Sequence, residues 1–185
     1  AGRARTREMY PLALSELAIG RNRYELDAML EDLLVYGAYP EVVSKSNSRS
    51  KQEYLHDLCS AYLYRDIVEL LPLRHGNKLR DLLKLLAFQV GSQVSLSELG
   101  SILGLSKDTV GNYIDLLEKS FVIFRVGGFS RNLRKEMTKM NKIYFYDCGV
   151  RNSIIGNHNQ LKDRDDVGRL WENFLMVERR KQLEY

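Results

Sequence analysis

Apolar residues recur at helical spacing in several stretches of the chain. The first stripe follows the i, i+3, i+4, i+7, i+8 pattern of one helix face and predicts a helix over residues 22–36. Its members are Leu26, Met29, Leu30, Leu33 and Leu34. Gly37 predicts the end of this helix, and Pro40 predicts a turn because it disfavours helical angles at Tyr39.

Two more apolar stripes follow a polar connector at residues 44–50. A wide apolar face predicts a helix over about 51–71, which Pro72 ends. The next stripe predicts a helix over about 77–90, and Gly91 closes it. The first ninety residues are therefore expected to be mainly helical.

The end of the chain carries one further predicted helix. Residues 151–166 are polar and are expected to form a loop. Residues 167–185 then predict an amphipathic helix, with apolar positions at Leu170, Trp171, Phe174, Leu175 and Val177. Because this helix reaches the last residue without a cap, a glycine or a proline, we expect the sequence to be a piece of a longer protein.

The most informative pattern is a pair of short helices joined by a tight turn. Ser95 and Glu98 form a capping-box pattern that starts a helix running to Leu103. Gly104 allows the turn, and Ser106 caps the second helix. We expect the apolar stripe of the second helix to face the first helix, with Val110, Tyr113, Ile114 and Leu117 packed on Leu99, Ile102 and Leu103. This spacing is typical of a helix-turn-helix unit.

Two β-rich segments follow the helix pair. Residues 121–126 form the first, and residues 142–146 are the strongest predicted strand of the chain. A paired strand after a helix-turn-helix unit gives the winged variant of that unit. The sequence therefore predicts a fold that is mainly α with a small β-wing; the alternative is an unrelated corner of two helices followed by a hairpin.

Positive charge is concentrated between the two β-rich segments. Residues 131–142, the basic run, carry five basic side chains and one acid, so their net charge equals the +4 of the whole chain. The basic residues are Arg131, Arg134, Lys135, Lys139 and Lys142. We expect them to contact nucleic-acid phosphates, which gives affinity without sequence information. The alternative is a solvated loop.

The second helix of the pair offers little for reading bases. Its expected surface residues sum to a charge of −1: Lys107, Asp108, Gly111, Asn112, Asp115, Glu118 and Lys119. Only Lys107 and Asn112 are of the types that usually contact base edges from a helix in the major groove. Any nucleic-acid binding is therefore expected to be non-specific.

Four motifs, in this order, resemble prokaryotic AAA-type (AAA+) ATPases that carry a C-terminal domain of unknown function. They are GAYPEVV at 37–43, YRDI at 64–67, the helix-turn-helix run at 96–121, and KIYFYDCG at 142–149. Residues 2–3 and 11–16 are also similar to the stretch that ends the nucleotide-binding core of that family. The resemblance covers nearly the whole chain.

The resemblance implies a division of the chain. Residues 1–43 correspond to the end of the ATPase core and a lid-like helical segment, and residues 51–150 to a helical and winged-helix domain. Residues 151–185 correspond to a loop and the start of a truncated nuclease-like segment, because the motif at 168–173 resembles the first helix of a restriction-endonuclease-like fold. The implied fold is a helical lid-like subdomain plus a winged helix-turn-helix.

The resemblance also implies ATP and magnesium for a longer protein, but not for this chain. No GxxxxGK[ST] phosphate-binding loop occurs in the sequence, so we expect no cofactor and no catalytic residue here. Arg3 is the candidate for an arginine finger that reaches the nucleotide of a neighbouring subunit. Oligomerisation would then depend on the ATPase core.

The sequence offers no metal site and no membrane segment. His56, His75 and His158 are widely separated, and Glu172 is a lone acid. Cys59 and Cys148 form no CxxC motif, and we expect Cys148 to be a buried structural thiol. No apolar run approaches the roughly 18 residues that a membrane-spanning helix needs. A cytoplasmic protein with no membrane partner is therefore expected.

The expected function is that of an accessory segment of an AAA-type ATPase. The segment would bind DNA non-specifically or a partner protein and couple this binding to the ATPase core. One alternative is a protein–protein docking module that binds no nucleic acid. A weaker alternative is part of a nuclease-like fold.

Overall fold

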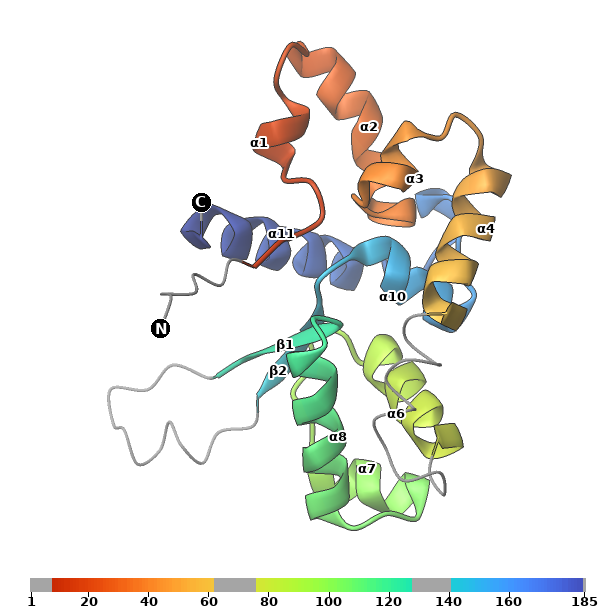
Figure 1. Ribbon diagram of the computed structural model, residues 1–185, viewed down its shortest axis with the longest axis vertical. Coiled ribbons are helices and arrows are strands. Elements are labelled where there is room, and N and C mark those ends of the chain that lie inside the picture. Colours follow the sequence, from red (N-terminus) through yellow and green to blue (C-terminus); the bar gives the residue numbers. More distant parts are fainter. Residues whose placement is uncertain (1–7, 62–75, 128–140, 185) are drawn as a thin grey trace, which may run out of the picture.

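The computed structural model describes residues 8–61, 76–127 and 141–184 (Figure 1). This part of the chain is mainly helical and carries one antiparallel sheet of two strands. The elements in chain order are α1 (Leu14–Leu17), α2 (Arg23–Tyr36), α3 (Pro40–Ser44), α4 (Ser48–Leu58), α6 (Gly76–Phe88), α7 (Leu96–Leu103), α8 (Lys107–Lys119), β1 (Ile123–Val126), β2 (Lys142–Phe145), α10 (Cys148–Ile155), the 3-10 helix η2 (Leu161–Asp163) and α11 (Val167–Glu184).

The predicted helix ends are confirmed at α2, α7 and α8. At the start of α2, the side chain of Asn22 accepts the N–H of Glu25, and the Glu25 carboxylate accepts the N–H of Asn22. Ser95 and Ser106 cap α7 and α8 in the same way, by accepting an N–H three residues later. Gly37 ends α2 with a φ of 79°, which favours glycine.

Two predictions about secondary structure differ from the structure or extend beyond its described residues. Residues 151–155 were expected to begin a loop, but they form the second half of α10, which Asp147 caps. The polar side chains of Arg151 and Asn152 are buried there and make hydrogen bonds. The predicted helix over 51–71 begins as α4 at Ser48, and residues 62–75 lie outside the described part of the chain. The motif at 64–67 and His75 therefore also lie outside it.

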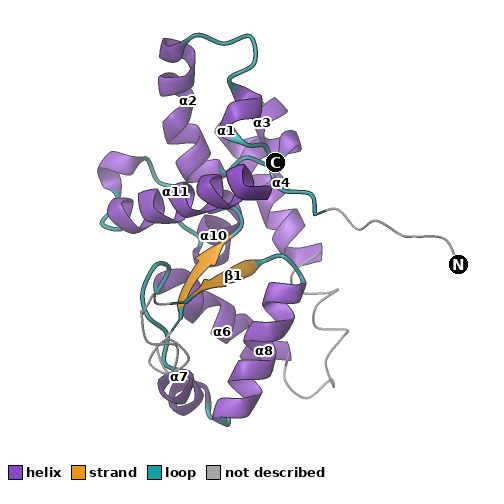
Figure 2. Ribbon diagram, turned by 90° about the vertical axis from the view of Figure 1, so that its left-hand side faces the viewer, coloured by secondary structure: helices purple, strands orange, loops and turns teal. Residues whose placement is uncertain are grey.

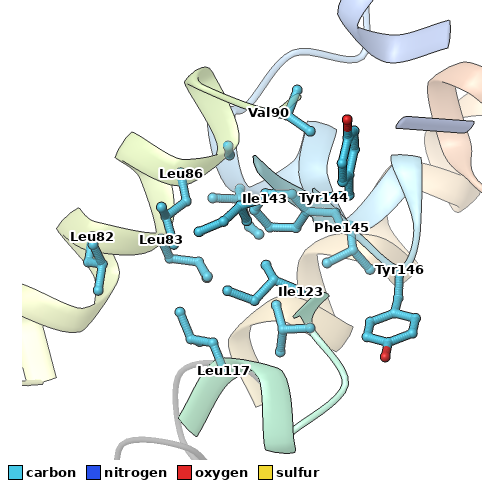
Figure 3. Packing of buried hydrophobic residues seen from close by; sticks show 14 of the residues in the cluster. Leu82, Leu83, Leu86, Val90, Leu117, Ile123, Ile143, Tyr144, Phe145 and Tyr146 are labelled. Atoms are coloured by element: carbon cyan, nitrogen blue, oxygen red, sulfur yellow. The ribbon is translucent and has the colours of Figure 1, made fainter. Parts of the chain in front are cut away.

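The two strands pair in antiparallel register and lie at the centre of the main apolar cluster. Ile123 lies opposite Phe145, and Val126 lies opposite Lys142. Figure 3 shows leucines of α6 and Leu117 of α8 converging on the side chains of β1 and β2. Burial of this kind contributes roughly 25 cal/mol per Å² of apolar surface removed from water. The hairpin and the three helices α6, α7 and α8 therefore share one core.

The other helices lie on the opposite side of the hairpin. Figures 1 and 2 show α10 and α11 on one side of the strands and α6, α7 and α8 on the other. A second apolar cluster joins α1, α2, α10 and α11 through Leu17, Leu34, Cys148, Leu170 and Phe174. No helix in the described part of the chain combines the length and the apolar character that a bilayer crossing requires.

Two of the predicted core positions are wrong. Ile102 on α7 is 57% exposed, and Leu175 on α11 is 58% exposed. The other residues of both stripes are buried or partly buried. Both helices therefore bury a narrower face than the sequence pattern predicted.

Candidate nucleic-acid interface

The helix pair α7–α8 presents the N-terminal half of α8 to solvent. Lys107 and Asn112 are both exposed, as expected for residues that could contact a ligand. On the opposite face of α8, Val110, Tyr113, Ile114 and Leu117 are buried. The predicted inward and outward faces of this helix are therefore confirmed.

Arg125 of β1 changes the charge of this surface. Its guanidinium bonds to Asp115 at 2.8 Å, and its Nε donates to Glu118 at 2.8 Å. The backbone N–H of Arg125 also donates to Glu118, at 3.0 Å. With Arg125 included, three cations of α8 and β1 balance three acids of α8, and the expected charge of −1 becomes zero.

Most of the basic run falls in a segment without a described structure. Arg131, Arg134, Lys135 and Lys139 lie outside the described residues, as does Arg3. By sequence, these four residues of the basic run belong to the connection between β1 and β2. Lys142 is the one basic residue of the run that the structure describes, and it is the first residue of β2.

Lys142 does not extend freely into solvent. Its Nζ donates to Glu172 Oε1 of α11 at 2.8 Å. The hydroxyl of Tyr144 donates to the same oxygen at 2.7 Å. The carboxylate of Glu172 therefore contacts a predicted phosphate-binding residue.

The edge of β2 that faces away from β1 has backbone groups paired at three alternate positions, 141, 143 and 145. The Asn141 carbonyl accepts the N–H of Val94 at 3.1 Å, and the Ile143 carbonyl accepts the N–H of Gly91 at 2.9 Å. At Phe145, the side-chain amide of Asn173 replaces a neighbouring strand: it accepts the N–H at 2.8 Å and donates to the carbonyl at 3.1 Å. An exposed strand edge is a template for pairing with other chains, and these contacts occupy it.

Gln93 adds a third strand position to the hairpin. It forms an isolated antiparallel bridge with Lys142, and it lies in the short connection between α6 and α7. The first residue of β2 thus has Val126 on one side and Gln93 on the other. The sequence contained no alternating pattern strong enough to predict this bridge.

Helix α11 also contacts the aromatic side chains of the hairpin. The guanidinium carbon of Arg180 lies 5.0 Å from the ring centroid of Phe124 and 5.3 Å from that of Tyr146. The Tyr10 ring lies 5.7 Å from that of Tyr146. A guanidinium over aromatic faces makes a favourable cation–π contact. Helix α11 therefore contacts the hairpin through Arg180 as well as through its hydrogen bonds to β2.

A second junction joins the motifs at 37–43 and 142–149. The fully buried carboxylate of Asp147 accepts the N–H of Ala38 at 2.8 Å and the N–H of Val150 at 2.9 Å. A Cβ on Gly37 would overlap the Asp147 carboxylate, and a Cβ on Gly149 would overlap the Tyr36 carbonyl. Burial raises the pKa of Asp147, and these N–H donors oppose the rise. We call these residues the Asp147 junction.

Asp147 was not among the residues that the sequence patterns indicated as structural. A signal existed, because Asp is a preferred N-cap and residue 147 follows the strongest strand directly. The contact with Ala38, which lies 109 positions earlier, has no local signal. The two motifs of the resemblance are therefore close in space, in a way that their separate patterns do not reveal.

A buried arginine network connects α10 to its neighbours. Arg151 donates to the Ala87 carbonyl at 2.8 Å and pairs with Asp166. Arg164 donates to Asp166 Oδ1 at 2.8 Å and to Asn152 Oδ1 at 3.0 Å. Asn152 in turn donates to the Leu34 and Val35 carbonyls. Each buried charge in this network has an opposite charge or a carbonyl as partner, as burial requires.

The described cysteines and histidines belong to residue types that can react or bind a metal ion. Cys59 and Cys148 are free and buried, and burial raises the pKa of the two thiols to about 11 and about 12. The expectation that Cys148 is a buried thiol is thus confirmed. His56 is exposed on α4, while His158 stacks on Tyr36 with ring centroids 5.7 Å apart. The described residues include no group of three His, Cys, Asp or Glu placed to hold a metal ion.

The chain is similar to two proteins that are described only as uncharacterized. It is 23% identical over 197 residues to the uncharacterized protein MJ1544 of Methanocaldococcus jannaschii, covering 98% of this chain and 43% of that protein. It is 24% identical over 180 residues to an uncharacterized protein of Haemophilus influenzae, covering 92% of this chain and 44% of that protein. The chain thus spans less than half the length of these relatives. No solved structure matches it.

The family match covers most of the chain, including the Asp147 junction, the helix pair α7–α8 and both strands. Residues 27–161 match the family described as Domain of unknown function (DUF8612), and the chain belongs to that family.

Proposed function

We propose that residues 76–146 form a winged-helix module. The observation that carries the proposal is the strand pairing at Lys142, which has Gln93 on one side and β1 on the other. The elements follow one another along the chain as α6, the bridge residue Gln93, α7, α8, β1 and β2. In a winged helix, a short strand after the first helix pairs with the last strand of the hairpin. The second and third helices then form the helix-turn-helix, here α7 and α8.

This module serves as a non-specific nucleic-acid contact. Four basic residues lie in the connection between β1 and β2, where the wing of such a module extends from the sheet. The α8 surface with Arg125 is neutral, so it favours neither attraction nor strong repulsion of phosphates. Any contacts from Lys107 and Asn112 of α8 add little to the affinity. Affinity then comes from charge neutralisation and carries little sequence information.

The module acts as part of a longer AAA-type ATPase. The motifs at 37–43 and 142–149 resemble that family, and the two relatives are more than twice as long as the aligned region. In this proposal residues 1–43 belong to the end of the ATPase core and its lid-like helices. ATP and magnesium bind the core, and the Asp147 junction transmits movement from residues 37–38 to β2.

Fluorescence anisotropy with labelled duplexes of unrelated sequence tests the proposal. The expected dissociation constant is roughly 10⁻⁴ to 10⁻⁶ M at physiological salt, similar for every sequence, and lower at reduced salt. Single strands and an uncharged polymer serve as comparisons. Absence of binding to any duplex or single strand at low salt would reject the nucleic-acid role.

The exposure of Ile102 supports a second candidate, a protein docking module. This side chain is 57% exposed on α7, next to the turn that leads into α8. A protein partner could bury this apolar side chain, whereas the charged phosphates of a nucleic acid would gain nothing from contact with it. If no nucleic acid binds, the docking module becomes the first candidate, and crosslinking from position 102 would identify its partner.

A further inference from the structure

Lys142 lies where the connection between the strands returns to the sheet. It is the first residue of β2 and lies opposite Val126, the last residue of β1. Its side chain is 43% exposed. Within the described part of the chain, it is therefore the one cation of the basic run that a phosphate could contact.

Glu172 of α11 already occupies one side of this cation. Its Oε1 accepts Lys142 Nζ at 2.8 Å and the Tyr144 hydroxyl at 2.7 Å. Hydrogen bonds from Lys142 and Tyr144 lower the pKa of the Glu172 carboxyl. The carboxylate is therefore negatively charged at neutral pH, and its own side chain is 42% exposed.

The backbone beside Glu172 is held in place. The next residue, Asn173, bonds to both the N–H and the carbonyl of Phe145. Because α11 is attached to β2 at this point, the carboxylate has a high effective concentration at Lys142. A side-chain rotation can release Lys142 briefly, but only detachment of α11 removes the competing charge.

We propose that Glu172 competes with nucleic-acid phosphate for Lys142, so that docked α11 lowers the affinity of the module for nucleic acid. This inference rests on the proposed function. A phosphate that approaches Lys142 must either displace the carboxylate or lie next to it. Two negative charges about 4 Å apart repel by roughly 1 kcal/mol in water and more near a protein surface. Movement of α11 away from β2 would remove this repulsion and expose Lys142.

A double-mutant cycle tests the competition. The proteins are the wild type, Glu172→Gln, Lys142→Gln and the double variant, titrated with one labelled duplex at several salt concentrations. The amide introduced by Glu172→Gln keeps an oxygen that accepts the Tyr144 hydroxyl. Glu53→Gln is the matched control, because it raises the net charge equally on α4, where Glu53 bonds to Arg49. Circular dichroism melts verify that each variant is folded.

We expect Glu172→Gln to bind about three- to tenfold more tightly at low salt, with a salt slope steeper by up to about one unit. Lys142→Gln alone should change affinity by less than about twofold, because Glu172 already engages that lysine. The double variant should lose the gain. Equal affinities of Glu172→Gln and Glu53→Gln would overturn the competition and leave the proposed function standing. If neither the wild type nor Glu172→Gln bound at low salt, the proposed function would fall, and this inference with it.

Discussion

The Asp147 junction leaves no room for a larger residue at Gly37 or Gly149. Gly37 and Gly149 bring the backbone after α2 into contact with the start of α10, and Asp147 supplies the acceptor for both segments. A buried carboxylate without such donors would be strongly unfavourable. The two glycines and the carboxylate are therefore parts of one arrangement.

Gly149→Ala tests this close approach. The added Cβ would overlap the Tyr36 carbonyl oxygen, which belongs to the backbone and cannot rotate away. We expect the free energy of unfolding to fall by about 1–3 kcal/mol or more. Gly168→Ala on α11 is the control, because nothing lies within 4 Å of its added Cβ. Urea denaturation should show that control unchanged or more stable by up to about 1 kcal/mol; equal effects of the two changes would contradict the close approach.

At the scale of elements, the helix pair α7–α8 was largely predictable from sequence. Ser95, Gly104 and Ser106 determine the helix ends, and they act through local hydrogen bonds and backbone angles. Ile102 was placed wrongly because helical spacing gives a direction but not the width of the buried face. On the short helix α7, Leu99 and Leu103 complete the contact with α8, and Ile102 lies beyond it.

Two alanine substitutions distinguish the buried and exposed positions of this pair. Leu117 is fully buried under β1 and β2, so Leu117→Ala should lower the free energy of unfolding by about 2–5 kcal/mol. Ile102→Ala should change it by less than about half a kcal/mol, because the side chain is already in water. Denaturant titrations of both variants give these values. A decrease below about half a kcal/mol at Leu117 would mean that α8 turns another face to the sheet.

Helix α10 could not be predicted because its polar residues are buried by distant partners. Arg151 and Asn152 resemble solvated positions in the sequence, yet Arg151 reaches Ala87 and Asn152 reaches Leu34 and Val35. A single sequence gives no signal for these long-range hydrogen bonds. The local features that indicate a helix are Asp147 at the N-cap and Gly156 after the last turn.

The buried arginine network makes stability depend on pH at the acid end. Burial raises the pKa of Asp166, but hydrogen bonds from Arg164 and Arg151 outweigh it and lower the pKa from 3.8 to about 2. Because the folded-state pKa is lowered, the stabilisation is present above about pH 4 and is lost as the pH falls through about 2. Asp166→Asn should therefore be less stable than the wild type at pH 7.

That difference should shrink as the pH approaches 2, when the wild-type carboxylate becomes protonated. Thermal melts of both proteins between pH 7 and pH 2 measure it. Asp163→Asn, an exposed change in η2, is the control and should have little effect at any pH. A constant difference between the wild type and Asp166→Asn across this range would show that Asp166 acts through shape instead of charge.

At the scale of the whole molecule, helices from both ends of the chain hold the hairpin in place. Residues 12 and 14 bond to Lys181 and Glu178 of α11, and α11 bonds to β2 through Glu172 and Asn173. Sequence patterns predicted α11 as a helix but not its place beside β2, since that contact spans about 30 positions. The position of Lys142 relative to α11 was therefore visible only in the structure.

The charge distribution of the molecule leads to the last prediction, that binding depends on the wing and not on α8. The four basic residues between the strands carry excess positive charge, whereas Arg125 leaves the α8 surface neutral. Replacing Arg131, Arg134 and Lys135 together by Ala should flatten the salt slope by up to about 3 units, one for each phosphate that is no longer neutralised.

Asn112→Ala should change the affinity for duplex by less than about twofold, because non-specific contacts do not use an amide to read a base. Replacing Arg23, an exposed cation at the start of α2, is the charge control and should leave the slope within about one unit. Anisotropy titrations over several salt concentrations measure all three. If Asn112→Ala abolished binding while the triple variant kept the wild-type slope, α8 would be the contacting element, because a neutral helix surface that binds must do so through specific hydrogen bonds.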